Sequence, residues 1–223
     1  MSIGLIINWK KWTKFFLLLK YYMKTEKYIL SENDCIEIPI PEKLGDCIIL
    51  VKSDLYRYIG KMKNIFICFL YTFRDPGFAC SFYYRFSQVR SIIYPLFRLL
   101  YFLLAHKYGI MLPRKLKCGY GLYIGHGFGT IINRSAIIGS NVNLSQFTTI
   151  GSNKNKAAII GDNVYIGPNV CVVENVKVGS NSTIGAGSVV VKYDVPKNTV
   201  VAGNPAKVIH ENKPGKNPNS FVN

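Results

Sequence analysis

Aliphatic residues recur every six positions through the second half of the chain. The series runs from Ile138 to Val190 and contains one enlarged step of ten residues, from Ile150 to Ile160. Helices require apolar spacings of three and four, and half-buried strands alternate every two residues, so neither explains a period of six. The sequence therefore predicts a hexapeptide repeat, whose members are Ile138, Leu144, Ile150, Ile160, Ile166, Val172, Val178, Ile184 and Val190.

A period of six suits short parallel strands that wind around a triangular prism, with three hexapeptides to each coil. The corners need residues that tolerate a positive φ angle, and Gly and Asn supply them; the corner asparagines are Asn141, Asn163, Asn169, Asn175 and Asn181. Each coil buries its aliphatic side chains only against its neighbours, so the prism needs a cap at both ends. We predict a mainly β fold, a parallel β-helix preceded by an α-helical N-terminal region. The enlarged step predicts a loop over residues 152–158.

The first coil contains a histidine. Counting back in sixes from Ile138 passes Ile132, His126 and Tyr120, and we expect the prism to begin near Cys118. On this count His126 occupies an inward position, where a titratable side chain is costly unless it is paired or used. Two interpretations stay open, a buried structural histidine and a base at the edge of a cleft.

The pattern divides the chain into four parts. We expect an N-terminal extension over 1–47, a helical domain over 48–113 that covers the open end of the prism, the β-helix over 114–209 and a disordered tail over 210–223. Pro39 and Pro41 make residues 34–45 a candidate linker. In the helical domain we expect Ser53 to cap a helix from about Asp54, residues 65–71 to be buried, and helices over 82–88 and 92–108 to follow a break at 74–78.

The N-terminal extension carries a helical apolar stripe, in which residues follow one another at steps of three or four: Leu5, Trp9, Trp12, Phe16, Leu19 and Met23. Lysines supply the rest of its surface. A basic amphipathic helix with tryptophans is typical of peripheral association with an anionic membrane, here through residues 5–24. Packing of the helix on its own domain explains the pattern equally well.

Composition limits the classes of partner and metal site that we expect for this chain. The net charge of +16 indicates an anionic partner, and nucleic acid is the weakest choice because no recognition motif accompanies the charge. The six cysteines have no paired spacing, which argues against a zinc site and against a disulfide framework and favours a reducing cytoplasm. We expect no metal. No apolar run reaches the roughly 18 residues that span a bilayer.

Five segments resemble the hexapeptide-repeat acyltransferases. Residues 121–151, with Ile124-Gly125-His126 and Leu144-Ser145-Gln146, and the ending at 184–188 and 203–207 are similar to serine acetyltransferases, whereas residues 52–58 and 75–78 resemble the polysaccharide O-acetyltransferases. The resemblance covers about residues 51–209. It implies a left-handed β-helix, a homotrimer with active sites between adjacent prisms, and acetyl-CoA as the acetyl donor.

The resemblance also implies site residues. His126 matches the catalytic histidine, and a neutral imidazole suits removal of a hydroxyl proton near neutral pH. Because a thioester is already activated, no covalent nucleophile is required, and nothing in sequence beside Cys171 would activate its thiol. The matching positions for the acceptor are Asp75, Asn133, Gln146 and Tyr165, and those for CoA are Pro168, Gly185, Ala186, Lys192 and Lys207.

The sequence departs from serine acetyltransferases at the acceptor. Gly125 stands where they have an aspartate, Met111 stands where they have the acid that orients the histidine, and the loop at 152–158 lacks their Arg-His pair. We therefore expect a carbohydrate acceptor, a sugar hydroxyl in a surface-polysaccharide precursor, acetylated in the cytoplasm or at the inner membrane face. Serine acetylation and a catalytically silent trimeric scaffold, which Met111 keeps open, are the alternatives.

Overall fold

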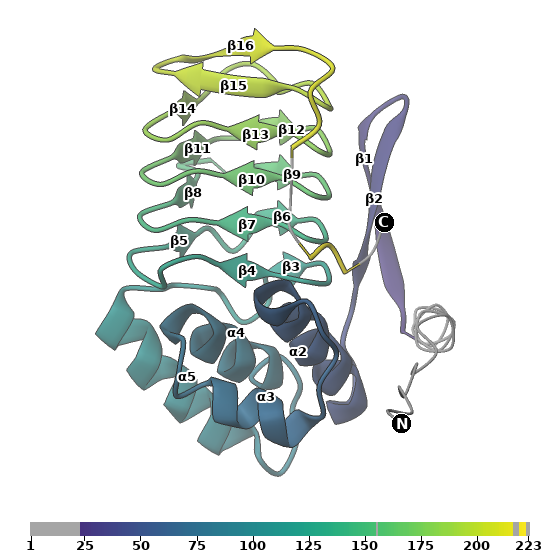
Figure 1. Ribbon diagram of the computed structural model, residues 1–223, viewed down its shortest axis with the longest axis vertical. Coiled ribbons are helices and arrows are strands. Elements are labelled where there is room, and N and C mark those ends of the chain that lie inside the picture. Colours follow the sequence, from purple (N-terminus) through teal and green to yellow (C-terminus); the bar gives the residue numbers. More distant parts are fainter. Residues whose placement is uncertain (1–22, 155, 216–218, 222–223) are drawn as a thin grey trace, which may run out of the picture.

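The computed structural model describes residues 23–154, 156–215 and 219–221. Helices form a base, a triangular prism of strands stands on it, and a β-hairpin lies along one side of the prism (Figure 1). The amphipathic helix predicted over residues 5–24 falls almost entirely outside the described residues and stays a prediction.

The prism consists of parallel sheets on three faces. One face holds β3 (Lys117–Cys118), β6 (Ile137–Ile138), β9 (Ile159–Ile160) and β12 (Lys177–Val178). A second holds β5 (Ile131–Ile132), β8 (Thr149–Gly151), β11 (Cys171–Val173) and β14 (Val189–Val190). The third holds β4 (Tyr123–Ile124), β7 (Asn143–Leu144), β10 (Tyr165–Ile166), β13 (Thr183–Ile184), β15 (Val200–Gly203) and the antiparallel β16 (Ala206–His210).

The repeat residues fill the interior of the prism as predicted. Eight of the nine aliphatic residues are 0% exposed, and Val190 is 2% exposed. Parallel pairs such as Ile166 with Ile184 keep identical positions above one another from coil to coil. The interior is therefore one aliphatic column, and the predicted parallel β-helix is confirmed.

The backward count in sixes is wrong in the first coil. Ile132 and Ile124 both point inward, and the step between them is eight residues. The two additional residues fall in a glycine-rich turn, so His126 lies on an outer corner, exposed, with a φ of 62°. Cys118 is the inward residue of β3 and is 3% exposed, which confirms the predicted start of the prism.

One corner of the prism carries an asparagine ladder. The side-chain amides of Asn141, Asn163 and Asn181 each donate to the next side-chain oxygen, and the ladder ends at Asn198. These four residues have φ angles of 57° to 60°, a region that asparagine tolerates better than most residues. Asn175, also predicted at a corner, is not one of the residues with positive φ; Glu174 is, at 63°.

The base contains α2 (Leu44–Ile59), α3 (Ile65–Tyr71), α4 (Pro76–Phe86) and α5 (Tyr94–Tyr108). The prediction for the first helix is wrong, because α2 begins ten residues before Asp54 and Ser53 donates to the Leu50 carbonyl inside it. The burial predicted for residues 65–71 is also wrong, since only Cys68 is buried. Among the described residues, no helix combines the length and the hydrophobicity needed to span a bilayer.

A hairpin replaces the predicted linker. Strands β1 (Thr25–Ser31) and β2 (Asp34–Pro39) pair and pack Leu30, Ile36 and Ile38 against the outer side chains of β6 and β9. The Asp34 carboxylate accepts hydrogen bonds from the Ser180 amide and hydroxyl, each at 2.7 Å. The two prolines are compatible with β2, because Pro39 is the last residue of the strand and Pro41 lies beyond it.

The C-terminal segment is not wholly a free tail. Gly215 donates to the Asn181 carbonyl, and the Phe221 amide donates to Asn141 on the second coil. The Asn219 side chain reaches the Arg57 carbonyl of α2 at 3.3 Å. In its described parts, the segment over 210–223 therefore runs back along the prism toward the base (Figure 1).

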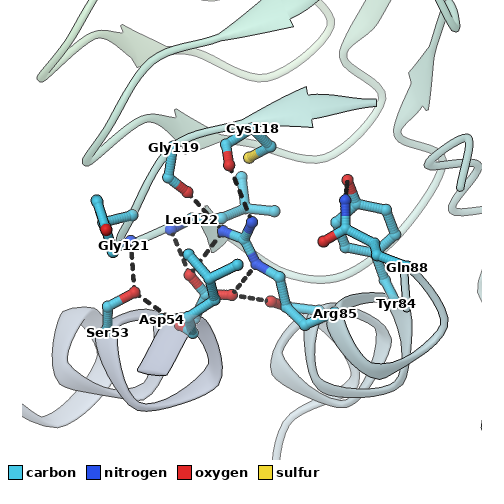
Figure 2. Close-up of polar contacts among 12 residues, drawn as sticks. Ser53, Asp54, Tyr84, Arg85, Gln88, Cys118, Gly119, Gly121 and Leu122 are labelled. Atoms are coloured by element: carbon cyan, nitrogen blue, oxygen red, sulfur yellow. Dashed lines mark hydrogen bonds and ion pairs between the residues drawn. The ribbon is translucent and has the colours of Figure 1, made fainter. Parts of the chain in front are cut away.

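Side chains of the base satisfy the open edge of the first coil. Arg85 donates to the carbonyls of Cys118 and Gly119, and the two oxygens of Asp54 bind Arg85 while one of them also accepts from the Leu122 amide (Figure 2). Ser53 accepts from the Gly121 amide. Edge strands leave such groups unpaired, and burying them without partners is costly, so these side chains take the place of a preceding coil.

We predict that Arg85→Met destabilises the protein by about 3–5 kcal/mol, because it leaves Asp54 charged, buried and unpaired. The free energy of unfolding from urea titrations measures this. Lys24→Met is the matched control: the Lys24–Glu42 pair is 67% and 65% exposed, and we expect a change below about 1 kcal/mol. Equal effects of the two substitutions would contradict the assigned role of Arg85.

Candidate functional site

A pocket lies where α2 meets the first coils of the prism. Its volume is about 370 Å³. His126 and Gly125 line it from the turn after β4, and outer residues of β4, β7 and β10 form its wall. The lining residues are Arg57, Tyr58, Tyr123, Gly125, His126, Asn143, Ser145, Tyr165 and Asn219.

Close backbone packing against the base fixes the turn that carries His126. A Cβ atom at Gly127 would lie 2.6 Å from the Gly77 nitrogen, and one at Gly77 would lie 2.1 Å from the Ile124 carbonyl oxygen. Side chains at either position would push the first coil and α4 apart. His126 itself keeps a positive φ, which a non-glycine residue holds only where the surroundings impose it.

The imidazole of His126 is free to meet a ligand. The side chain is exposed, and within the described part of the chain no hydrogen bond to it is found. Met111, at the position of the family's orienting acid, is 59% exposed and forms a bridge with Ile131. Among the described residues, the His126 side chain therefore has no acidic partner.

Three tyrosines, Tyr58, Tyr123 and Tyr165, line the pocket together with His126. The Tyr58 hydroxyl donates to the Ile124 carbonyl and accepts from the Ile124 amide, at 3.1 and 3.0 Å. Its ring lies 4.4 Å from that of Tyr123. Burial, and next the charge of Asp75, raise the pKa of Tyr123 above its ordinary value, so its phenol stays protonated at neutral pH. Tyr165, predicted near the acceptor, lines the pocket on the third coil.

Asp75 lies beside the pocket and is not one of its lining residues. It is the N-cap of α4 and accepts a 2.8 Å hydrogen bond from the Phe78 amide. Burial raises the pKa of Tyr58 well above its usual value, and Asp75 adds to that rise. The carboxylate is therefore close enough to influence the pocket electrostatically while it also holds the start of a helix.

The structure separates the other predicted acceptor residues. Asn133 accepts from the amide and hydroxyl of Ser135 in a local turn and does not line the pocket. Gln146 lies one coil above His126 on the same corner, and its buried Oε1 has no hydrogen-bond partner. Of the three predicted acceptor residues on the prism, Gln146 and Tyr165 lie on the same side as His126, and Asn133 does not.

The predicted CoA positions follow this corner upward. The corner between the third and second faces carries His126, Gln146, Pro168 and Ala186 on successive coils, joined by bonds such as Gly187 amide to Pro168 carbonyl at 2.9 Å. Gly185 lies under Ala202, whose strand partner is Lys207. With strands about 4.8 Å apart, His126 lies roughly 14 Å below Ala186. Lys192 instead follows β14 at the next corner.

Sequence reasoning missed most of the pocket. Arg57 and Tyr58 come from α2, a segment that the sequence predicted to be helical but did not connect with the site. Asn143 and Ser145 are outward-facing residues of the repeat. One signal was available: outer positions of a β-helix need no particular residue type, so polar groups beside a histidine-bearing corner mark a candidate site.

The comparisons with known proteins agree with this geometry. Residues 157–192 match the family model described as bacterial transferase hexapeptide (six repeats). The chain resembles serine acetyltransferases. It is 34% identical over 106 residues to serine acetyltransferase 2 of Arabidopsis thaliana, covering 46% of this chain and 32% of the relative. It is 32% identical over 143 residues to serine acetyltransferase of Synechococcus elongatus, covering 60% and 57%.

Solved structures extend the likeness to the base. Serine acetyltransferase from Neisseria gonorrhoeae superposes with a TM-score of 0.61 at 29% identity, covering 75% of this chain and 66% of that one. The soybean apoenzyme gives 0.60 at 25% identity, covering 72% and 67%. The predicted left-handed β-helix with a helical N-terminal region and the resemblance to hexapeptide-repeat acyltransferases are confirmed; no comparison singles out the polysaccharide branch. The chain spans only about a third of the length of the plant relatives.

We predict that Gly77→Ala destabilises the protein by more than about 2 kcal/mol, because its Cβ would enter the van der Waals shell of the Ile124 carbonyl. Gly45→Ala is the matched control. It lies in α2, a Cβ there meets nothing within 4 Å, and alanine in a helix is neutral or stabilising by up to about 1 kcal/mol. Thermal unfolding followed by circular dichroism measures both. Similar midpoints would refute the close approach of α4 to the first coil.

Proposed function

We propose that the protein is an acetyl-CoA-dependent O-acetyltransferase in which His126 is the general base. The observation that carries this proposal is the position of His126: it faces a pocket and begins the corner that continues through Pro168 and Ala186. The similarity to proteins named serine acetyltransferase supports the reaction class.

The upper corner suits an extended CoA molecule. It is built from small residues, and a Cβ at Gly187 would meet nothing within 4 Å, so a chain can lie against the backbone. The buried, unpartnered Oε1 of Gln146 can accept an amide hydrogen bond there. Lys207, exposed at the end of this corner, can meet a phosphate group.

The chemistry requires one base and a means of releasing the thiolate. Acetyl-CoA supplies an acetyl group already activated as a thioester. His126 accepts the proton of the acceptor hydroxyl while that oxygen bonds to the acetyl carbon, and it returns the proton to the sulfur when the carbon–sulfur bond breaks. The hydroxyl groups of Tyr123 and Tyr165 can donate to the acceptor and hold it beside the imidazole.

For the acceptor, the comparisons favour the alternative over the carbohydrate that we expected from the sequence. Each relative and solved structure reported above bears the name serine acetyltransferase. We therefore propose L-serine as the first acceptor to test. We also propose a homotrimer, as the resemblance to hexapeptide-repeat acyltransferases implies, in which the prism of an adjacent copy would help to close the pocket.

One observation keeps a carbohydrate acceptor as the second candidate. None of the described residues that line the pocket is a carboxylate, and Gly125 replaces the acid that would meet the serine ammonium group. Tyrosine rings, two asparagines and a serine suit a sugar with several hydroxyl groups. A site in the cytoplasm or at its membrane face remains part of this second candidate.

We predict that His126→Ala lowers the rate of acetyl transfer by about 10²- to 10⁴-fold, the usual contribution of a general base. Release of CoA thiol from acetyl-CoA measures the rate, with L-serine, neutral sugars and capsule oligosaccharides as separate acceptors. His106→Ala is the control, because His106 is exposed on α5 and does not line the pocket.

The outcomes separate the candidates. Thiol release with L-serine supports the first acceptor, and release only with carbohydrate supports the second. A purified trimer that releases no thiol with any acceptor, and behaves identically after His126→Ala, would reject catalysis and favour the scaffold alternative.

A further inference from the structure

A buried arginine, Arg57, lines the pocket. Arg57 is 3% exposed, although it is a lining residue of the cavity. Its guanidinium donates to the side-chain oxygen of Asn143 and, at 3.5 Å, to the Gly121 carbonyl. Its Nε is buried and has no hydrogen-bond partner. A group with five N–H donors is thus only partly satisfied.

Among the described residues, no carboxylate forms an ion pair with Arg57. The nearest candidate on its own helix, Asp54, is fully used, because its two oxygens already bind Arg85, Ser81 and the Leu122 amide. Buried arginines normally have a charged partner, because removal from water is costly.

The surroundings of Arg57 offset only part of its lost hydration. Burial lowers the pKa of Arg57 to about 10, although Asp54, Tyr58 and Tyr123 act to raise it. The other lining residues are tyrosines, an asparagine pair, a serine, a glycine and His126. An anion that entered the pocket would therefore meet a preformed positive charge with few competing contacts.

We propose that Arg57 is a subsite for a carboxylate group of the acceptor, and that the enzyme selects acceptors which carry a carboxylate together with the reacting hydroxyl. This inference rests on the proposed acetyl transfer and deepens it. An arginine–carboxylate pair is charge-assisted and directional, so it would orient the hydroxyl toward His126, which lines the same cavity.

Two sources of this chemistry fit. A free amino acid presents a carboxylate beside an ammonium group, and Asp75, next to the pocket tyrosines, could attract that ammonium. A sugar acid presents a carboxylate without an ammonium group. Gly125 stands where serine acetyltransferases have an aspartate, and this difference leaves the pairing of either carboxylate with Arg57 unchanged.

The test compares matched acceptors that differ only in the carboxylate. L-Serine is measured against L-serine methyl ester, and D-glucuronate against its methyl ester, with release of CoA thiol as the readout. We expect kcat/KM to favour at least one acid over its ester by about 10- to 100-fold, the range of one charge-assisted bond. Which pair shows the preference identifies the source.

Substitutions assign the preference to Arg57. Arg57→Met should lower kcat/KM for the acid far more than for its ester and so remove the discrimination, whereas Arg57→Lys should retain part of it. Arg90→Met is the matched control, since Arg90 is exposed, carries the same charge and does not line the pocket. A wild-type enzyme that uses acid and ester equally, or an Arg57→Met variant that loses both rates equally while Arg57→Lys restores neither, would overturn the proposal.

A binding measurement separates this inference from the proposed function. Calorimetry without acetyl-CoA detects L-serine or D-glucuronate bound to wild type, with weaker binding to Arg57→Met. Such binding in a protein that releases no thiol would support the subsite and reject acetyl transfer. Thiol release without any preference for the acid would do the reverse.

Discussion

The buried ion pair between Asp54 and Arg85 is the interaction on which the rest of the structure depends. Both side chains are 0% exposed, and together they bind three backbone groups of the first coil, at Cys118, Gly119 and Leu122 (Figure 2). A β-helix must end somewhere, and its last coil exposes unpaired backbone groups. Here α2 and α4 supply the missing partners, so the base and the prism form one structure.

The same contact places the pocket. Arg57 and Tyr58 follow Asp54 by three and four residues, which carries them about one helical turn further along α2. Tyr58 binds both backbone groups of Ile124, two residues before His126. The helix that closes the prism therefore also forms one wall of the site, and the position of the histidine depends on the packing of the base.

The repeat made the prism predictable, because a strict period fixes which side chains point inward. The count failed between Ile124 and Ile132, because it was extended at a fixed step of six while two additional residues in this turn shift the inward position to Ile124 and turn His126 outward. The hairpin at residues 25–39 and the start of α2 at Leu44 were also missed. Prolines near the end of an edge strand give the same sequence pattern as a linker, so residues 34–45 were interpreted as one. Arg57 could not be assigned to the site, since its role depends on contacts between segments far apart in sequence.

Amide hydrogen exchange in the wild-type protein tests the central claim most directly. The amides of Gly121, Leu122 and Ile124 have side-chain partners from α2, namely Ser53, Asp54 and Tyr58. If the base replaces a missing coil, these amides exchange as slowly as the Gly139 and Thr149 amides, which bond within the prism. Rapid exchange at the first three, with continued protection of the other two, would show that the helices merely lie near the prism and do not close it.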